Sequence, residues 1–202
     1  MAAEETRARL LAATIDAIDA GGESAASVDE VAKAAGVTAP TIYNYFRNRE
    51  ALISEAQAAR FDRQLDNDFA LLTDAVLAIS SQEEFERITD MVFSFMLDPE
   101  RSASRLNRLS AIGAATGRPE LADAIAQKAV GVAERFASLM EPLQSKGFIR
   151  ADLDLLAFSS WFIGTVAGRV LIEIGANPVD TAAWDRIFRE AVLAVTLPRP
   201  TA

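Results

Sequence analysis

Apolar side chains recur three or four positions apart over most of this sequence, and the strict alternation typical of β-strands is scarce. Over residues 6–20 this spacing places Leu10 and Ile18 on one face of a first predicted helix. Gly21 and Gly22 follow directly, and glycine is common where a helix ends. The pattern therefore predicts an all-α protein that begins with an amphipathic helix.

Two shorter predicted helices follow, separated by a tight turn. Ser27 is a candidate N-cap with Glu30 three residues later, which is the spacing of a capping box. Gly36 interrupts the helical pattern. Thr38 can then cap a second short helix with Pro40 in its first turn, where a missing N–H costs little. Two short helices joined in this way meet the requirement of a helix-turn-helix.

The second of these helices has distinct inner and outer faces. Ile42 and Phe46 are four residues apart, which places both on the inward side. The outer side carries hydroxyl, amide and aromatic groups, which can bond phosphate oxygens and base edges of double-stranded DNA. With flanking positions included, the candidate DNA-binding residues are Ser27, Thr38, Ala39, Pro40, Thr41, Tyr43, Asn44, Tyr45 and Arg49.

Net charge is the feature that most opposes DNA binding. The chain carries a formal charge of −9, and residues 1–50 hold five basic and eight acidic side chains. The segment from Thr38 to Phe46 contains no basic residue. Because phosphate attraction is local and salt-dependent, we expect modest affinity, strong salt dependence and a reliance on dimerisation.

The remainder of the chain is predicted to form a larger helical bundle. Turn signals such as Asp98-Pro99 and Gly117 divide it into long helical segments. Residues 155–168 carry no formal charge, but a membrane span needs roughly 20 apolar residues. We therefore expect this run to be a buried core or interface helix, and no membrane segment.

Composition excludes several kinds of catalytic and metal site. The chain contains no cysteine and no histidine, which removes disulfides, thiolate zinc sites, cysteine nucleophiles and histidine-based triads. It also lacks a glycine-rich phosphate loop and a cluster of metal ligands. We therefore expect no catalytic residue, metal or cofactor. The start of the chain lacks the apolar stretch of a signal peptide, so we expect a cytoplasmic protein.

The stretch VDEVAKAAGVTAPTIYNYFRNREALI, residues 28–53, resembles the DNA-binding signature of the tetracycline-repressor (TetR) family. The resemblance implies that the outward residues between positions 39 and 45 line a recognition surface. It also implies a phosphate contact for Arg49, where family members often carry lysine. The implied organisation is a three-helix DNA-binding domain over residues 1–50 and a ligand-binding and dimerisation bundle over residues 51–202.

The resemblance further implies a homodimer on a palindromic operator, acting as a repressor that an unidentified small-molecule effector releases. In this family the last two long helices of each subunit form the dimer interface. The candidate interface residues are Phe158, Phe162, Gly164, Gly168, Trp184, Phe188 and Val192. The candidate ligand-binding residues inside the bundle are Phe93, Met96, Leu109, Ile112, Phe136, Met140, Trp161, Thr165 and Arg169.

Three alternatives remain open from the sequence. The acidic N-terminal region allows a dimeric ligand-binding or protein-interaction module whose DNA binding has weakened. Activation of transcription rather than repression is a further alternative that the motif leaves open. An enzyme is disfavoured, because carboxylate pairs such as Glu83-Glu84 are adjacent on a helix and do not face one another.

Overall fold

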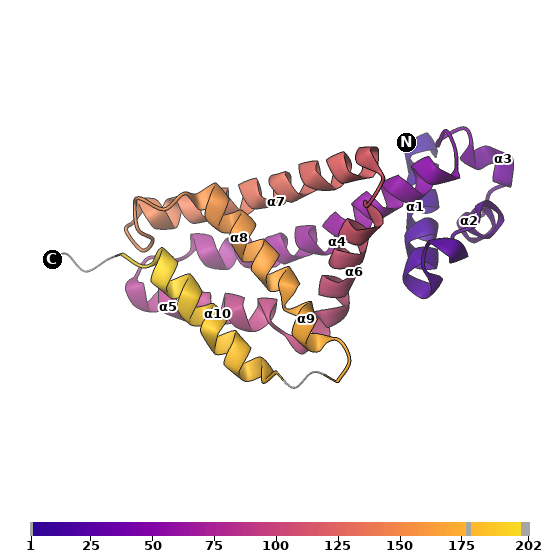
Figure 1. The fold of residues 1–202 in the computed structure, drawn as a ribbon. Coiled ribbons are helices and arrows are strands. Elements are labelled where there is room, and N and C mark those ends of the chain that lie inside the picture. The colour runs from indigo at the N-terminus through magenta and orange to yellow at the C-terminus, as the bar shows by residue number, and fades with distance from the viewer. Residues whose placement is uncertain (1, 177–178, 199–202) are drawn as a thin grey trace. The chain divides into compact units, whose positions relative to one another are not determined.

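The computed structural model describes residues 2–176 and 179–198, with side chains for all of them except residues 2 and 62–72. Every regular element in these ranges is a helix, which confirms the predicted all-α class (Figure 1). In chain order the elements are α1 (Ala2–Gly21), η1 (Glu23–Ala25), α2 (Val28–Ala35), α3 (Ala39–Ile42), α4 (Arg49–Leu77), α5 (Gln82–Met96), η2 (Pro99–Arg101), α6 (Ser102–Ala114), α7 (Pro119–Ser145), α8 (Leu155–Gly168), α9 (Val170–Glu173) and α10 (Thr181–Thr196).

The chain divides into two compact units. The first unit comprises residues 1–63 with 110–128, and the second comprises residues 64–109 with 129–202. The predicted DNA-binding region therefore lies entirely in the first unit, together with the N-terminal part of α4. Because all three divisions fall inside helices, α4, α6 and α7 each contribute residues to both units.

The first unit is organised by capping and by a sharp turn between α2 and α3. The Ser27 hydroxyl accepts the backbone N–H of Glu30 at 3.2 Å, as an N-cap side chain does. Gly36 ends α2 in the left-handed conformation, with φ of 69°, which favours glycine. The turn folds Ile42 and Phe46 onto the core formed by α1, α2 and the start of α4, and both side chains are buried.

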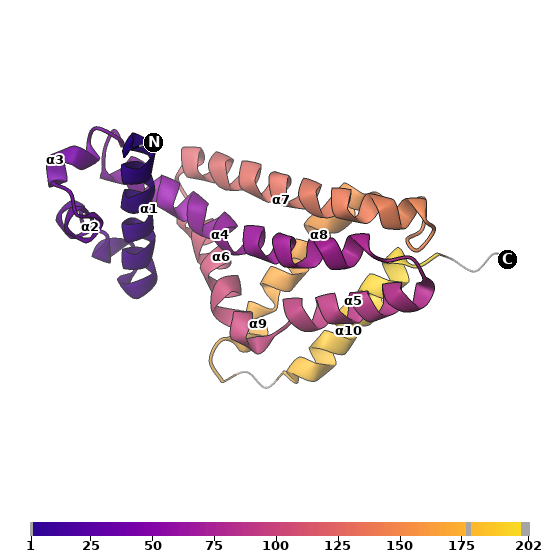
Figure 2. The same cartoon turned by 180° about the vertical axis from the view of Figure 1, so that it is seen from behind.

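The second unit has an aromatic core between α5, α7, α8 and α10. Phe162 lies 5.1 Å from Phe136 and 5.3 Å from Phe188, measured between ring centroids. Phe93 meets Phe188 edge-on at 5.8 Å, which packs α5 against α10. Both views of the ribbon accordingly have α5 and α10 side by side (Figures 1 and 2).

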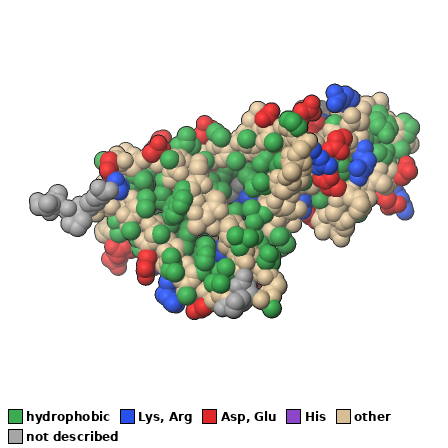
Figure 3. Space-filling view, viewed as in Figure 1, with side chains coloured by type: hydrophobic (Ala, Val, Ile, Leu, Met, Phe, Trp, Pro, Cys, Tyr) green, Lys and Arg blue, Asp and Glu red, His purple; other side chains and the backbone are tan. Residues whose placement is uncertain are grey.

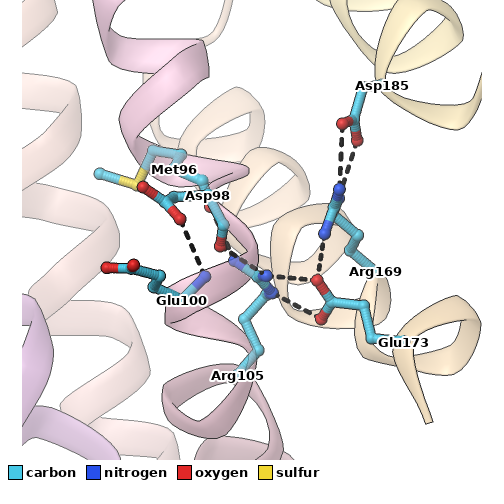
Figure 4. A network of polar contacts seen from close by, with 7 residues as sticks. All are labelled: Met96, Asp98, Glu100, Arg105, Arg169, Glu173 and Asp185. Atoms are coloured by element: carbon cyan, nitrogen blue, oxygen red, sulfur yellow. Dashed lines mark hydrogen bonds and ion pairs between the residues drawn. The ribbon is translucent and has the colours of Figure 1, made fainter. Parts of the chain in front are cut away.

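A buried ionic network ties α6, α9 and α10 of this unit together (Figure 4). Glu173 accepts hydrogen bonds from the guanidinium groups of Arg105 and Arg169. Arg169 also donates to Asp185 at 2.7 and 3.0 Å, and Arg105 donates to the Met96 carbonyl oxygen at 3.0 Å. The side chains of the two arginines are each 3% exposed, so the network is part of the unit's interior.

Candidate nucleic-acid interface and ligand cavity

The second helix of the helix-turn-helix is shorter than its sequence pattern predicts. Regular α-helix covers only Ala39–Ile42, and tighter turns follow as far as Phe46. Thr38 holds the N-cap position, but its hydroxyl lies 2.8 Å from the Thr41 hydroxyl and makes no bond to the helix backbone. The helix therefore lacks the side-chain cap that we expected from Thr38.

The candidate DNA-binding residues differ in how much of each side chain solvent reaches. Tyr43 is 55% exposed, and Thr38, Pro40 and Asn44 are also exposed. The other five are half-buried, namely Ser27, Ala39, Thr41, Tyr45 and Arg49. Tyr45 packs against the core of the first unit. Tyr43 and Asn44 are therefore two adjacent exposed side chains with polar groups, directly after the end of α3.

Arg49 is engaged within the protein. Its guanidinium donates to the carbonyl oxygen of Ala26 at 3.1 Å and to that of Glu23. These bonds attach the start of α4 to η1 and the following turn. A phosphate contact by this guanidinium, as the sequence led us to expect, would have to compete with both carbonyl oxygens.

A polar cluster around Glu23 is the feature of the first unit that sequence reasoning missed. The Glu23 carboxylate accepts two hydrogen bonds from Arg118, both at 2.7 Å, and one from Gln57 at 2.8 Å. The bonds from Arg118 are the main reason that the pKa of Glu23 is lowered below 4.5. Arg118 also lies 2.8 Å from Glu50. No local pattern relates Glu23 to a partner 95 positions away.

The second unit contains a cavity of about 80 Å³. Side chains from the end of α4 and from α5, α7, α8 and α10 line it, and Ile149 completes the wall. The wall is almost entirely hydrocarbon, with five phenylalanines among its sixteen residues. Its only hydroxyl groups belong to Thr89 and Thr196, and no charged side chain of the described chain lines it. This arrangement can hold an apolar guest and offers no group for acid–base or nucleophilic chemistry.

Comparison with known proteins places the first unit in a family. Residues 10–56 match the family model described as bacterial regulatory proteins, tetR family. The chain carries the N-terminal domain of the tetR family. The resemblance predicted from residues 28–53, together with the leading helix from Arg9 to Gly21, is thereby confirmed.

Solved structures extend the likeness to the whole chain. A tetR-family transcriptional regulator from Mesorhizobium loti is 21% identical, with a TM-score of 0.72 over 98% of this chain and 100% of its own. A regulator of the same family from Cytophaga hutchinsonii is 19% identical, with a TM-score of 0.70 over 98% of both chains. The fatty acid degradation regulator FadR from Bacillus halodurans is 21% identical, with a TM-score of 0.60 over 93% of this chain and 94% of its own.

At these identities the likeness to solved structures establishes the fold. The chain therefore has the fold of a tetR-family transcriptional regulator, with a helix-turn-helix and a helical bundle. No curated protein matches the sequence significantly.

The helical bundle brings together only part of the predicted ligand site. Phe93, Phe136 and Met140 line the cavity. Five other candidates lie outside its wall, because they are exposed or only half-buried elsewhere, namely Met96, Leu109, Ile112, Trp161 and Thr165. Arg169 also lies outside the described wall, and its guanidinium is bound to Glu173 and Asp185. The missed lining residues include Phe85, Ile88 and Val92, whose helical spacing was a usable signal.

Four of the predicted dimer-interface residues are instead part of the interior of one subunit. Phe158, Phe162, Phe188 and Val192 are each 5% exposed or less and belong to the aromatic core. Such side chains cannot reach a second copy, so their assignment to the interface was wrong. Among the other predicted interface residues, Trp184 and Gly168 are half-buried and Gly164 is exposed.

The apolar side chains that solvent does reach lie elsewhere on these helices. Figure 3 shows hydrophobic side chains gathered over α8 and α10 on one face of the bundle. The large exposed ones on α8, α9 and α10 are Leu156, Trp161, Leu171, Ile187 and Val195. We call this set the α8–α10 apolar surface.

Metal binding and membrane insertion are two further possibilities that the described residues allow us to assess. Within the described residues no group of three acidic side chains is placed to hold a metal ion. The stretch Leu155–Glu173 is long and apolar enough to cross a membrane, although the core helix of a soluble protein passes the same test. Phe158 and Phe162 within it are buried in the bundle, which favours the core helix.

Proposed function

We propose that this protein is a dimeric, cytoplasmic, sequence-specific regulator of transcription. In this proposal residues 1–50 bind a palindromic double-stranded operator, and residues 51–202 bind a ligand and dimerise. The observation that carries it is the exposed pair Tyr43 and Asn44, held next to α3 while Ile42 and Phe46 are buried beneath. A polar and aromatic surface on a rigid support is suited to reading base edges.

Each exposed group has a distinct use in this proposal. The Asn44 amide can pair with adenine, and the hydrocarbon of Pro40 can contact a thymine methyl group. The Tyr43 and Ser27 hydroxyls can donate to phosphate oxygens. Because the region is acidic and Arg49 is bound to carbonyl oxygens, few charged phosphate contacts are available. The proposal therefore requires two copies of the domain on one operator.

We further propose that the protein is a repressor and that a ligand in the cavity releases it from DNA. The support is that α4, α6 and α7 contribute residues to both units, so a change around the cavity has continuous helices along which to propagate. Two discrete arrangements of these helices, one favoured by the ligand and the other by the operator, would make each binding event weaken the other. Linkage then requires the operator to weaken ligand binding by the same factor, typically about 5–150-fold.

The α8–α10 apolar surface supports the homodimer. We expect Ile187→Glu to convert the dimer to a monomer at micromolar concentration, because Ile187 is 67% exposed and a charge there would be buried by the partner. Sedimentation velocity provides the measurement. Val130→Glu is the matched control, since Val130 is 51% exposed on α7, outside this surface. A parent protein that sediments as a monomer would refute the dimer.

The DNA-binding proposal is tested by selecting bound fragments from random double-stranded DNA at low salt. We expect the parent to enrich a palindromic site and Tyr43→Ala to bind that site about fivefold more weakly, the scale of one lost hydrogen bond to a phosphate oxygen. Met91→Ala, at an exposed apolar residue of the second unit, is the control and should bind normally. Failure to enrich any sequence would instead support a ligand-binding or protein-interaction dimer.

A further inference from the structure

We infer that the cavity in the second unit selects small, uncharged, hydrocarbon-like molecules. This inference rests on the proposed function, because it assigns a ligand class to the cavity proposed there as the effector site. Three observations support it: the chemistry of the cavity wall, the ion pairs that nearby arginines already make, and the volume of the cavity.

The wall offers almost nothing to a polar ligand. Among the sixteen described residues that line the cavity, fourteen have apolar side chains, and the Thr196 hydroxyl already donates to the Val192 carbonyl oxygen at 2.9 Å. Thr89 supplies the other hydroxyl. An ionised ligand would lose its hydration without gaining a charged partner, which strongly disfavours its entry. An uncharged molecule gains free energy simply by leaving water.

Arginines near the cavity are not positioned to neutralise an anionic ligand. Arg189 lies over the Phe93 ring at 4.9 Å and pairs with Asp90. Arg105 and Arg169 are held by Glu173, and Arg169 also by Asp185. None of these guanidinium groups is part of the cavity wall. A carboxylate or phosphate group would have to break an existing ion pair to reach any of these three arginines, and Lys146 already donates to the carbonyl oxygen of the lining residue Ile79 at 2.6 Å.

The volume of the cavity limits its guest to a small molecule. The cavity of about 80 Å³ is smaller than an engineered apolar cavity of about 150 Å³ that binds benzene, so a guest as large as one ring must also displace side chains of the wall. Phe136, Phe158 and Phe162 contribute ring faces and edges to the wall, with centroid separations of 5.1 and 6.0 Å. Aromatic rings pair well at such separations. Met140 adds a flexible side chain that can yield to a guest.

The test compares toluene with benzoate in the full chain by calorimetric titration at pH 7, without DNA. The two probes share one ring and differ in charge. We expect saturable binding of toluene and at least tenfold weaker binding of benzoate. Equal or tighter binding of benzoate would overturn the inference, as would the absence of saturable toluene binding.

A cavity-filling variant locates the binding. Val92→Phe adds a ring at the cavity wall and should weaken toluene binding at least tenfold. Met91→Phe makes the same addition at the neighbouring position, where the side chain is 41% exposed, and should bind toluene like the parent. Unchanged toluene binding in folded Val92→Phe would overturn the assignment to this cavity. The comparison of probes in the parent decides the ligand class even where this variant does not fold.

The outcomes also separate this inference from the proposed function. Toluene binding that leaves operator affinity unchanged would support the ligand class and remove ligand-controlled release. Operator binding by a protein that takes up no toluene would leave the DNA-binding regulator intact and overturn the inference alone.

Discussion

Glu173→Gln is expected to lower the free energy of unfolding by about 3–5 kcal/mol, the usual cost of breaking a buried ion pair. The Glu173 side chain is 7% exposed and is the shared acceptor of Arg105 and Arg169. The neutral amide would leave two buried guanidinium groups with Asp185 as their remaining carboxylate in the network. Denaturant unfolding at pH 7, followed by circular dichroism, measures the loss.

The pH dependence of this loss identifies its electrostatic origin. Burial raises the pKa of Glu173, but hydrogen bonds and charges from Arg105 and Arg169 outweigh burial and hold it below 4.5. A carboxyl group with a lowered pKa stabilises the fold above its unfolded-state pKa, and this contribution is lost as pH falls through the folded-state value. The difference between parent and Glu173→Gln should therefore shrink on acidification below about pH 4.5.

A matched substitution controls for the general effect of removing a negative charge. Glu134→Gln changes an exposed carboxylate on α7 of the same unit and should alter stability by less than about 0.5 kcal/mol. Equal stability of Glu173→Gln and the parent at pH 7 would mean that the buried network contributes no net stabilisation.

Phe46→Ala is expected to destabilise the first unit by about 3–5 kcal/mol and to abolish operator binding. The Phe46 ring is 2% exposed and fills the core beneath the turn after α3, with the Arg7 guanidinium 5.2 Å from its centroid. Truncation leaves a cavity under the residues that present Tyr43 and Asn44. Amide hydrogen exchange measures the loss, because amides of α2 and α3 should exchange faster.

Phe46→Leu is the conservative control for Phe46→Ala, because it keeps a large apolar side chain at this position. Leucine fills most of the space, so we expect a smaller loss and DNA binding that persists at reduced temperature. Slow exchange of α2 and α3 amides in Phe46→Ala, unchanged from the parent, would show that Phe46 does not support this region.

Much of the local structure was predictable because it depends on residues close together in the chain. The Ser27 cap and the end of the helix at Gly36 were both predicted from the sequence and are both present. The inward position of Ile42 and Phe46 followed from their spacing of four residues. Thr38 was the exception, since its hydroxyl could bond either the helix backbone or Thr41, and pattern alone does not distinguish the two.

The bundle was harder to predict because α8 is apolar on nearly all sides. In such a helix the periodicity does not mark which side faces the interior, so Phe158 and Phe162 were assigned to a partner subunit when they belong to the core. The Glu173 network had one visible sign, the spacing of four residues from Arg169. Its link to Arg105 joins residues 68 positions apart, which no local pattern reveals.

The sequence by itself determined the helical class, the helix-turn-helix over residues 27–46 and the absence of cysteine and histidine chemistry. Helix periodicity, capping and side-chain inventory are local properties, which explains why these conclusions needed no coordinates. Tertiary structure alone decided which apolar side chains line the cavity and which stay exposed. It also decided which acceptor groups bind the guanidinium groups of Arg49, Arg118 and Arg169. These outcomes depend on contacts between helices distant in the chain, whose geometry is set by packing across the core.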